Sequence, residues 1–176
     1  MKIISSLMAA TALTFLLNCP AHAQMDMAET VSPVTIAAPA DWKPQNDALG
    51  DGLLAAFVDP KTENRIELLS KQIIRDEHAA ALFDAFASQL VSSGFIVTAP
   101  GTEKLFDLAD GSIRKGTWTE YTYITSDIHI SIVTFIFTAQ SHAIIVVGYF
   151  SRAEREHGIE TLQTLIRNMA DSSKTN

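Results

Sequence analysis

The feature that most constrains the fold is a series of strand candidates between residues 95 and 150, joined only by short turns. These candidates cover residues 95–99, 105–109, 113–124, 128–138 and 143–150. Asp110-Gly111 is a strong hairpin signal, and Ser126-Asp127 predicts a second turn. Gly116, inside the third candidate, is typical of a β-bulge. Strands that follow one another through short turns pair antiparallel, because a parallel pair needs a long crossover.

Three further strands and a helix are predicted upstream. The strands cover residues 34–37, 53–58 and 65–74, and a proline-flanked corner at 39–44 interrupts the first of them. Asp76 is a suitable helix N-cap, and Gly94 is a suitable C-terminal glycine. Between them, apolar residues recur at helical spacing: Ala79, Leu82, Phe83, Phe86 and Leu90.

A second helix is predicted near the C-terminus. Ser151–Glu154 has the spacing of a capping box, and the apolar face runs from Ile159 to Met169. Gly158 weakens the first turns, so we expect the regular part to begin near His157. The resulting order, β-β-β-α-β-β-β-β-α, predicts an α+β fold: an antiparallel sheet of about six to seven strands covered by two helices.

The N-terminus predicts export. Lys2 is followed by a mainly apolar run from Ile3 to Leu17, and Ala21-His22-Ala23 places small residues before a cut at Gln24. The run is too short for a stable membrane span. We therefore expect a signal peptide at 1–23, a flexible leader at 24–32, one domain at 33–170 and a disordered tail at 171–176. The expected compartment is a bacterial periplasm.

A lipoprotein signal is the alternative interpretation of the same segment. Leu16-Leu17-Asn18-Cys19 resembles a cleavage site before a lipidated Cys19, although Asn18 is a poor residue at that position. Cys19 is the only cysteine in the chain. Cleavage after Ala23 removes it, which excludes disulfides, thiol catalysis and thiolate metal sites.

Charge excludes further classes of function. The formal net charge is −7, and removal of residues 1–23 takes away only Lys2, which gives −8. The chain has no Lys/Arg run. Binding to nucleic acid or to an anionic membrane surface is therefore not expected.

The order of several short features resembles the PsbP-like superfamily, which includes the DcrB-like exported bacterial proteins. The matching pieces are Val34-Thr35-Ile36 with Pro39-Ala40-Asp41-Trp42, Phe57-Val58-Asp59-Pro60, the helix end Leu90 to Phe95, and the apolar strand before the C-terminal helix. The match covers about residues 33–170. The resemblance implies a mostly non-catalytic protein that acts as an assembly factor, extrinsic subunit or chaperone-like adaptor.

The sequence has no recognisable catalytic or metal-binding pattern, so we expect a protein that is not an enzyme. The chain lacks a Gly-x-Ser-x-Gly elbow, a phosphate-binding glycine loop, a His-Glu-x-x-His helix and a calcium loop. The four histidines outside the signal peptide fall in separate predicted elements: His78, His129, His142 and His157. We expect no cofactor and no metal site.

Aromatic side chains are the candidate binding residues. Trp118 and Tyr121 differ by an odd number of positions and so point to opposite faces of the sheet, whereas Tyr121 and Tyr123 share a face. An aromatic face left uncovered by a helix could bind a peptide, lipid or sugar. We select Trp42, Tyr121 and Tyr123 as candidates and expect Trp118 to be core.

Three hypotheses for function follow. The first is a periplasmic, non-enzymatic binding or accessory module that engages a protein partner of the cell envelope at a sheet face or edge. The second is a carrier of a small hydrophobic ligand, with a pocket between the sheet and a helix. The third is an enzyme whose site has no recognisable motif, which would show perturbed pKa values clustered in one cleft. The sequence leaves the oligomeric state open.

Overall fold

The computed structural model describes residues 32–45, 52–73 and 76–172. The predicted signal peptide, Cys19 and nearly all of the leader lie outside the described residues. The elements are β1 (Val34–Thr35), β2 (Lys43–Pro44), β3 (Leu53–Val58), β4 (Arg65–Gln72), α2 (Asp76–Ser92), β5 (Ile96–Asp107), β6 (Ile113–Ile124), β7 (His129–Ala139), β8 (His142–Ser151), α3 (Arg155–Asn168) and β9 (Ala170–Asp171).

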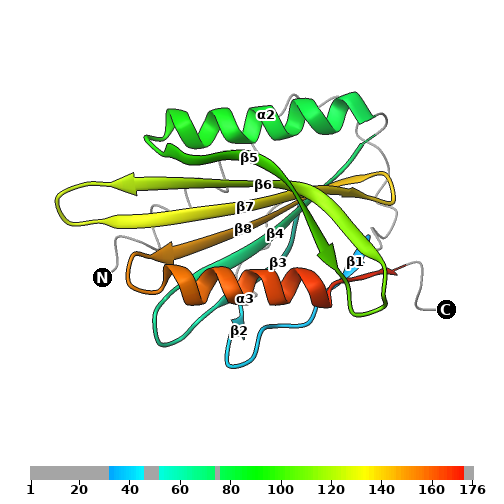
Figure 1. Cartoon of the computed structure of the whole chain (residues 1–176), viewed down its shortest axis with the longest axis horizontal. Helices are drawn as coiled ribbons and strands as arrows, with labels where there is room; N and C mark the ends of the chain where they lie inside the picture. Colours follow the sequence, from blue (N-terminus) through cyan, green and yellow to red (C-terminus); the bar gives the residue numbers. More distant parts are fainter. Residues whose placement is uncertain (1–31, 46–51, 74–75, 173–176) are drawn as a thin grey trace.

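Seven strands form one antiparallel sheet in the order β2-β3-β4-β8-β7-β6-β5. The chain leaves β4, passes through α2 to the opposite edge, and returns strand by strand until β8 pairs with β4. β8 is the central strand of this order, and eight of its ten residues are buried. The predicted α+β class and order of elements are confirmed (Figure 1).

The two helices pack on opposite faces of the sheet. Leu162, Leu165 and Ile166 of α3 join a core with Trp118 and Phe135. Phe86 and Leu90 of α2 join a second core with Tyr121 and Ile132. Side chains alternate between faces along each strand, which separates the two cores. In Figure 1 the sheet lies between α2 and α3.

The edge strand β5 differs from the prediction. Residues 95–99 and 105–109 were expected as separate strands, but β5 is continuous across Pro100 and Gly101. Its register against β6 shifts between Val97 and Ala99 and again between Ala99 and Thr102. Bulges in β5 absorb the turn-like residues, because an edge strand tolerates proline and irregular pairing. The bulge expected at Gly116 is wrong, since Gly116 pairs regularly with Lys104.

The start of α3 also differs. The helix begins at Arg155, before Gly158, and the N-cap Glu154 makes no side-chain capping hydrogen bond. The predicted capping box at Ser151 is therefore wrong, because Ser151 still belongs to β8. Gly158 has a packing role: a Cβ there would lie 2.3 Å from Cδ1 of Phe150.

Both ends of the domain contain pairing that the sequence did not predict. β2 adds a short outer strand with Pro44, where the edge position tolerates a missing N–H. β1 leaves the main sheet and pairs with β9, with Val34 opposite Asp171. Asp171 was expected in a disordered tail, and this is wrong because β9 and a side-chain ion pair hold it.

Candidate binding cleft

The sheet divides at one end into two branches. The ladder between β6 and β7 runs from the Ile124–His129 pair to the Thr117–Ile136 pair and stops there. β6 continues to Ile113 paired only with β5, and β7 continues to Ala139 paired only with β8. Two strand edges, residues 113–116 and 137–139, are therefore released from each other (Figure 1).

Gly116 lies at the point of division. A Cβ at this position would be 2.5 Å from the carbonyl oxygen of Ile136 and 2.6 Å from the ring of Phe135. Only glycine allows this close approach of β6 to β7 before the strands separate.

A cleft of about 620 Å³ lies at the division, and we call it the fork cleft. Its apolar lining comes from Phe83, Leu108, Ile113, Phe137 and Ala139, and its polar lining from Glu103, Ser112, Arg114, Lys115, Thr117, Thr138 and Asp171. Gly116 completes the lining. The volume is within the range of ligand sites, and a mixed lining of this kind can bind and orient a partner.

Arg114 is the buried charge of the fork cleft. Its side chain is 5 % exposed, and Nη2 donates to Oδ1 of Asp171 at 2.6 Å. Nη1 points to the carbonyl oxygen of Met169 at 3.5 Å, and the guanidinium lies 4.7 Å from the ring centroid of Phe137. Burial lowers the pKa of Arg114, while Asp171 acts in the opposite direction. The ion pair joins β6 to β9 and closes one side of the cleft.

Lys115 is the second cation of the fork cleft, and unlike Arg114 its side chain is exposed to solvent. Its Nζ lies 2.6 Å from Oε2 of Glu103, and the two side chains are 66 % and 60 % exposed. An ion pair this exposed contributes little to stability and exchanges readily with solvent. Lys115 can therefore leave Glu103 and bind an anionic group of a partner at little cost in stability.

The lining of the fork cleft combines hydroxyl, charged and apolar side chains. Three hydroxyl side chains line it, Ser112, Thr117 and Thr138, but no histidine does. Among the described residues, no group of three or more His, Cys, Asp or Glu side chains could hold a metal ion. No described helix is long and apolar enough to cross a membrane.

The predicted aromatic candidates lie elsewhere. Trp42 is 8 % exposed in the α3-side core, and Tyr121 is 3 % exposed in the α2-side core. Tyr123 is half-buried, with its ring 5.2 Å from that of Phe95. Trp118 is core and faces away from Tyr121, as predicted. None of the three candidates lines the fork cleft, and Trp42 and Tyr121 are instead buried in the two cores.

Sequence reasoning did not find the fork cleft. The hairpin at Asp110-Gly111 and the unusual Gly116 were both visible in the sequence. The separation of β6 from β7 depends on contacts across the sheet, so no local pattern encodes it. The available signal was a glycine inside a long β-branched and aromatic strand, which marks a close backbone approach.

Comparisons with known proteins give a fold. No family model matches the chain, and no curated protein sequence matches it. The crystal structure of LpqN, involved in cell envelope biogenesis of Mycobacterium tuberculosis, is similar with a TM-score of 0.54 and 13% identity, over 78% of this chain and 82% of LpqN. The Ran-binding protein Mog1p of Saccharomyces cerevisiae gives 0.54 and 8% identity, over 80% of this chain and 92% of Mog1p.

The solution structure of cyanobacterial PsbP from Synechocystis is also similar, at 9% identity and a TM-score of 0.49, over 87% of this chain and 99% of that protein. At these identities a comparison shows a shared fold alone. The matches to LpqN and Mog1p, each with a TM-score of 0.54, confirm the predicted resemblance at the level of the α+β fold.

Proposed function

We propose that this chain is an exported, non-enzymatic accessory module of the cell envelope that holds an extended segment of a partner protein in the fork cleft. The observation that carries the proposal is the pair of released strand edges, 113–116 and 137–139, facing one cleft. An extended segment placed there gains backbone hydrogen bonds from the edges, and side-chain pockets add selectivity.

The other edges of the sheet suit strand addition poorly. β5 is bulged at two places and contains Pro100, which has no N–H to donate. β2, at the opposite edge, has only two residues. The fork cleft is therefore the best place for an added strand among the described residues.

Two further considerations support an exported, non-catalytic role. The N-terminal sequence has the pattern of a signal peptide, with cleavage after Ala23. LpqN is involved in cell envelope biogenesis, and Mog1p is a Ran-binding protein. A binding role for this chain agrees with both.

An enzymatic role is less well supported by the electrostatics. Burial raises the pKa of Glu67 and of Tyr149, but these side chains lie inside the sheet core and outside the fork cleft. The Tyr149 hydroxyl donates to Glu67 Oε2 at 3.2 Å. Perturbed groups that no substrate can reach have a structural role.

A carrier of a small hydrophobic ligand is the second candidate for the same cleft. Four charged residues in the lining, Glu103, Arg114, Lys115 and Asp171, make it a poor container for a purely apolar molecule. If the protein is a carrier, native mass spectrometry after gentle purification should show the chain with a bound molecule of a few hundred daltons.

The test is site-specific photo-cross-linking in the native cell envelope. A photoreactive residue replaces Thr138, which is exposed and lines the cleft, and a matched control replaces Thr164, exposed on the outer side of α3. We expect Thr138 alone to capture one discrete protein. A synthetic copy of the captured segment should bind the purified protein and shift the amide signals of residues 113–116 and 137–139.

Identical capture at both positions, or none at Thr138, would refute the proposal. The mass of the recovered chain tests export separately: a chain beginning at Gln24 supports the signal peptide, and a lipid on Cys19 supports the lipoprotein alternative.

A further inference from the structure

One row of side chains on β6 lies along the released edge of the fork cleft. Ile113, Lys115 and Thr117 are spaced two positions apart, so they point to the same face of the sheet. Tyr121 continues this row into the α2-side core. All three of the first residues line the cleft and are exposed, so α2 leaves this end of the row uncovered.

Thr138 lies on the same face, across the division of the sheet. Thr119 of β6 pairs with Thr134 of β7, and residues directly opposite each other in a ladder share a face. Thr138 is four positions beyond Thr134, is exposed and also lines the cleft. A strand added between the released edges would therefore place every second side chain on this face, next to the row on β6.

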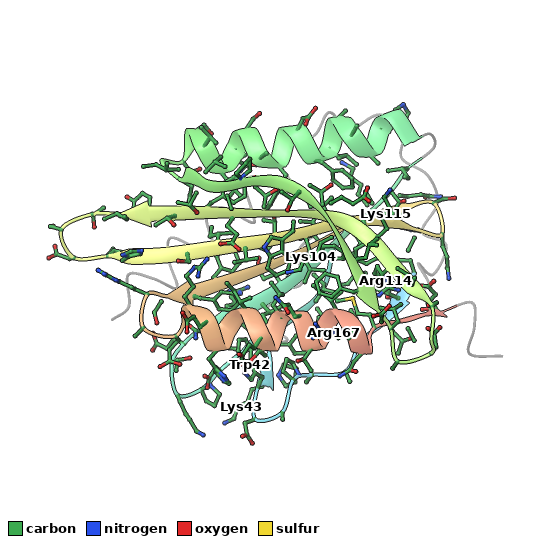
Figure 2. All side chains as sticks on the ribbon, viewed as in Figure 1. Trp42, Lys43, Lys104, Arg114, Lys115 and Arg167 are labelled. Carbon is green, nitrogen blue, oxygen red and sulfur yellow. The ribbon has the colours of Figure 1, made fainter. Side chains whose placement is uncertain are left out.

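Lys115 is the charged residue of β6 that such a side chain would meet. Arg114 points to the opposite face and already binds Asp171 (Figure 2). The carboxylates of Glu103 and Asp107 belong to β5, which lies one strand farther from the cleft. Neighbouring strands are about 4.8 Å apart, so a strand added beside β6 reaches Lys115 before it reaches either carboxylate.

The ion pair with Glu103 leaves Lys115 able to bind a second carboxylate. Its Nζ lies 2.6 Å from Oε2 of Glu103, but an ammonium group has three N–H donors. The pair is exposed and weakly held, so it also yields readily to a competing anion. A partner that covers Lys115 excludes water, which strengthens the attraction between the two opposite charges.

Ile113 provides an apolar contact beside Lys115. Its side chain is 63 % exposed, and Leu105, which is opposite Lys115 in the register, is 58 % exposed. Ile113 is two positions from Lys115 along β6. On an added strand, the residue that packs on Ile113 is therefore two positions from the residue that meets Lys115.

We propose that the partner segment carries an acidic side chain and, two positions away, an apolar one: the carboxylate binds Nζ of Lys115, and the apolar side chain packs on Ile113. This inference rests on the proposed function and names its partner chemistry. A partner with Lys or Arg opposite Lys115 is disfavoured by like-charge repulsion. A slip of one residue would move both side chains to the other face, so the pattern also fixes the register.

The experiment is an NMR titration of the ¹⁵N-labelled protein with the capped peptide Thr-Val-Ala-Glu-Ala-Val-Thr, whose residue order is the same in both chain directions. Matched peptides carry Gln or Lys in place of Glu, or Ser in place of both Val residues. We expect the Glu peptide to bind most tightly and to shift the amide signals of residues 113–116 and 137–139. The Gln peptide should bind about two- to fivefold more weakly, as expected for loss of a cross-strand ion pair, and high salt should reduce this difference. The Ser peptide should bind about three- to tenfold more weakly, because it buries less apolar area.

Variants of the protein locate the effect. Lys115→Gln should reduce binding of the Glu peptide to that of the Gln peptide, and Lys115→Glu should make the Lys peptide the tightest binder. Glu103→Gln should tighten the Glu peptide by about two- to threefold, because a competing carboxylate is removed. The matched control, Lys43→Gln, removes an exposed cation from β2 at the opposite edge of the sheet and should leave binding within about a factor of two.

The outcomes separate this inference from the proposed function. Equal binding of the Glu and Gln peptides, tightest binding of the Lys peptide, no binding of any peptide, or equal losses in Lys115→Gln and Lys43→Gln would overturn the acidic-partner inference. Equal binding of the Ser and Val peptides would overturn the contact with Ile113. The inference would fall alone if Thr138 still captured a protein in the envelope, whereas absence of that capture would refute the proposed function itself.

Discussion

Replacement of Gly116 by alanine should destabilise the protein, because β6 and β7 approach too closely for a Cβ at the point where they separate. The added Cβ would lie 2.5 Å from the carbonyl oxygen of Ile136 and 2.6 Å from two ring atoms of Phe135. Contacts below 3.0 Å essentially do not occur for a real Cβ, so these neighbours must move. Gly116 has no positive φ, so alanine is otherwise compatible with its backbone.

The neighbours have little room to move. Phe135 is fully buried, and its ring contacts Phe106 at 5.0 Å and Phe137 at 5.5 Å between centroids. Ile136 is held in register by Thr117 on one side and Ile145 on the other.

Overpacking of this kind costs about 1–3 kcal/mol. The reduced chain entropy of alanine in the unfolded state offsets about 0.4–1 kcal/mol of that. We expect a net loss of about 1–2 kcal/mol in the free energy of unfolding, measured by urea denaturation with an unchanged m-value.

A double-mutant cycle tests the cause. Phe135→Leu removes ring atoms from the path of the new Cβ, so it should cost less in the Gly116→Ala background, with a coupling of at least about 0.5 kcal/mol. Gly111→Ala is the control: its φ of 79° makes alanine unfavourable, but no atom lies within 4 Å and no coupling to Phe135 is expected. A Gly116→Ala protein as stable as the wild type, or a coupling of zero, would refute the reasoning.

Three further predictions concern buried groups. Asp171→Asn should lower the free energy of unfolding by about 1–3 kcal/mol, because it leaves the buried Arg114 without its anion. Arg114→Met should lower it less, since the Asp171 side chain left behind is 32 % exposed. A larger loss for Arg114→Met than for Asp171→Asn would contradict the conclusion that Arg114 is the buried member of the pair. Burial raises the pKa of Glu67 above its ordinary 4.5, so the folded state holds this proton more tightly and stability falls as pH rises from 4.5 through the raised pKa. Glu67→Gln should remove that fall in urea denaturation at a series of pH values, and an unchanged slope would show that other groups cause it. Gly158→Ala should destabilise by about 1–3 kcal/mol through the Phe150 ring, and a gain in thermal stability would show that helix propensity decides at this position.

Local patterns predicted most of the secondary structure because strand alternation, helical spacing and turn residues act within a few positions of the chain. The hairpin at Asp110-Gly111 and the helix ending near Gly94 are of this kind, and each glycine has a positive φ. The division of Trp118 and Tyr121 between opposite cores followed from the period of two along a strand.

Predictions failed where contacts with residues distant in the sequence determine the local conformation. β5 remains one strand across Pro100 because β6 supplies a continuous partner and the outer edge needs none. Gly158 does not delay α3, because the helix packs its glycine against Phe150 of β8. Asp171 is ordered because it meets Arg114, a residue 57 positions earlier.

The sequence by itself therefore determined the α+β class, the antiparallel sheet and the placement of Trp118 and Tyr121 on opposite faces, since these depend on periodicity and short turns. The tertiary structure alone decided that both faces are covered, which buries Trp42 and Tyr121, and that β6 separates from β7 beyond Thr117. It also placed Lys104 and Arg167 over one ring although 63 positions separate them in the chain. The physical reason is that a cleft, or a contact between residues far apart in the chain, arises between surfaces whose positions depend on the whole packed sheet.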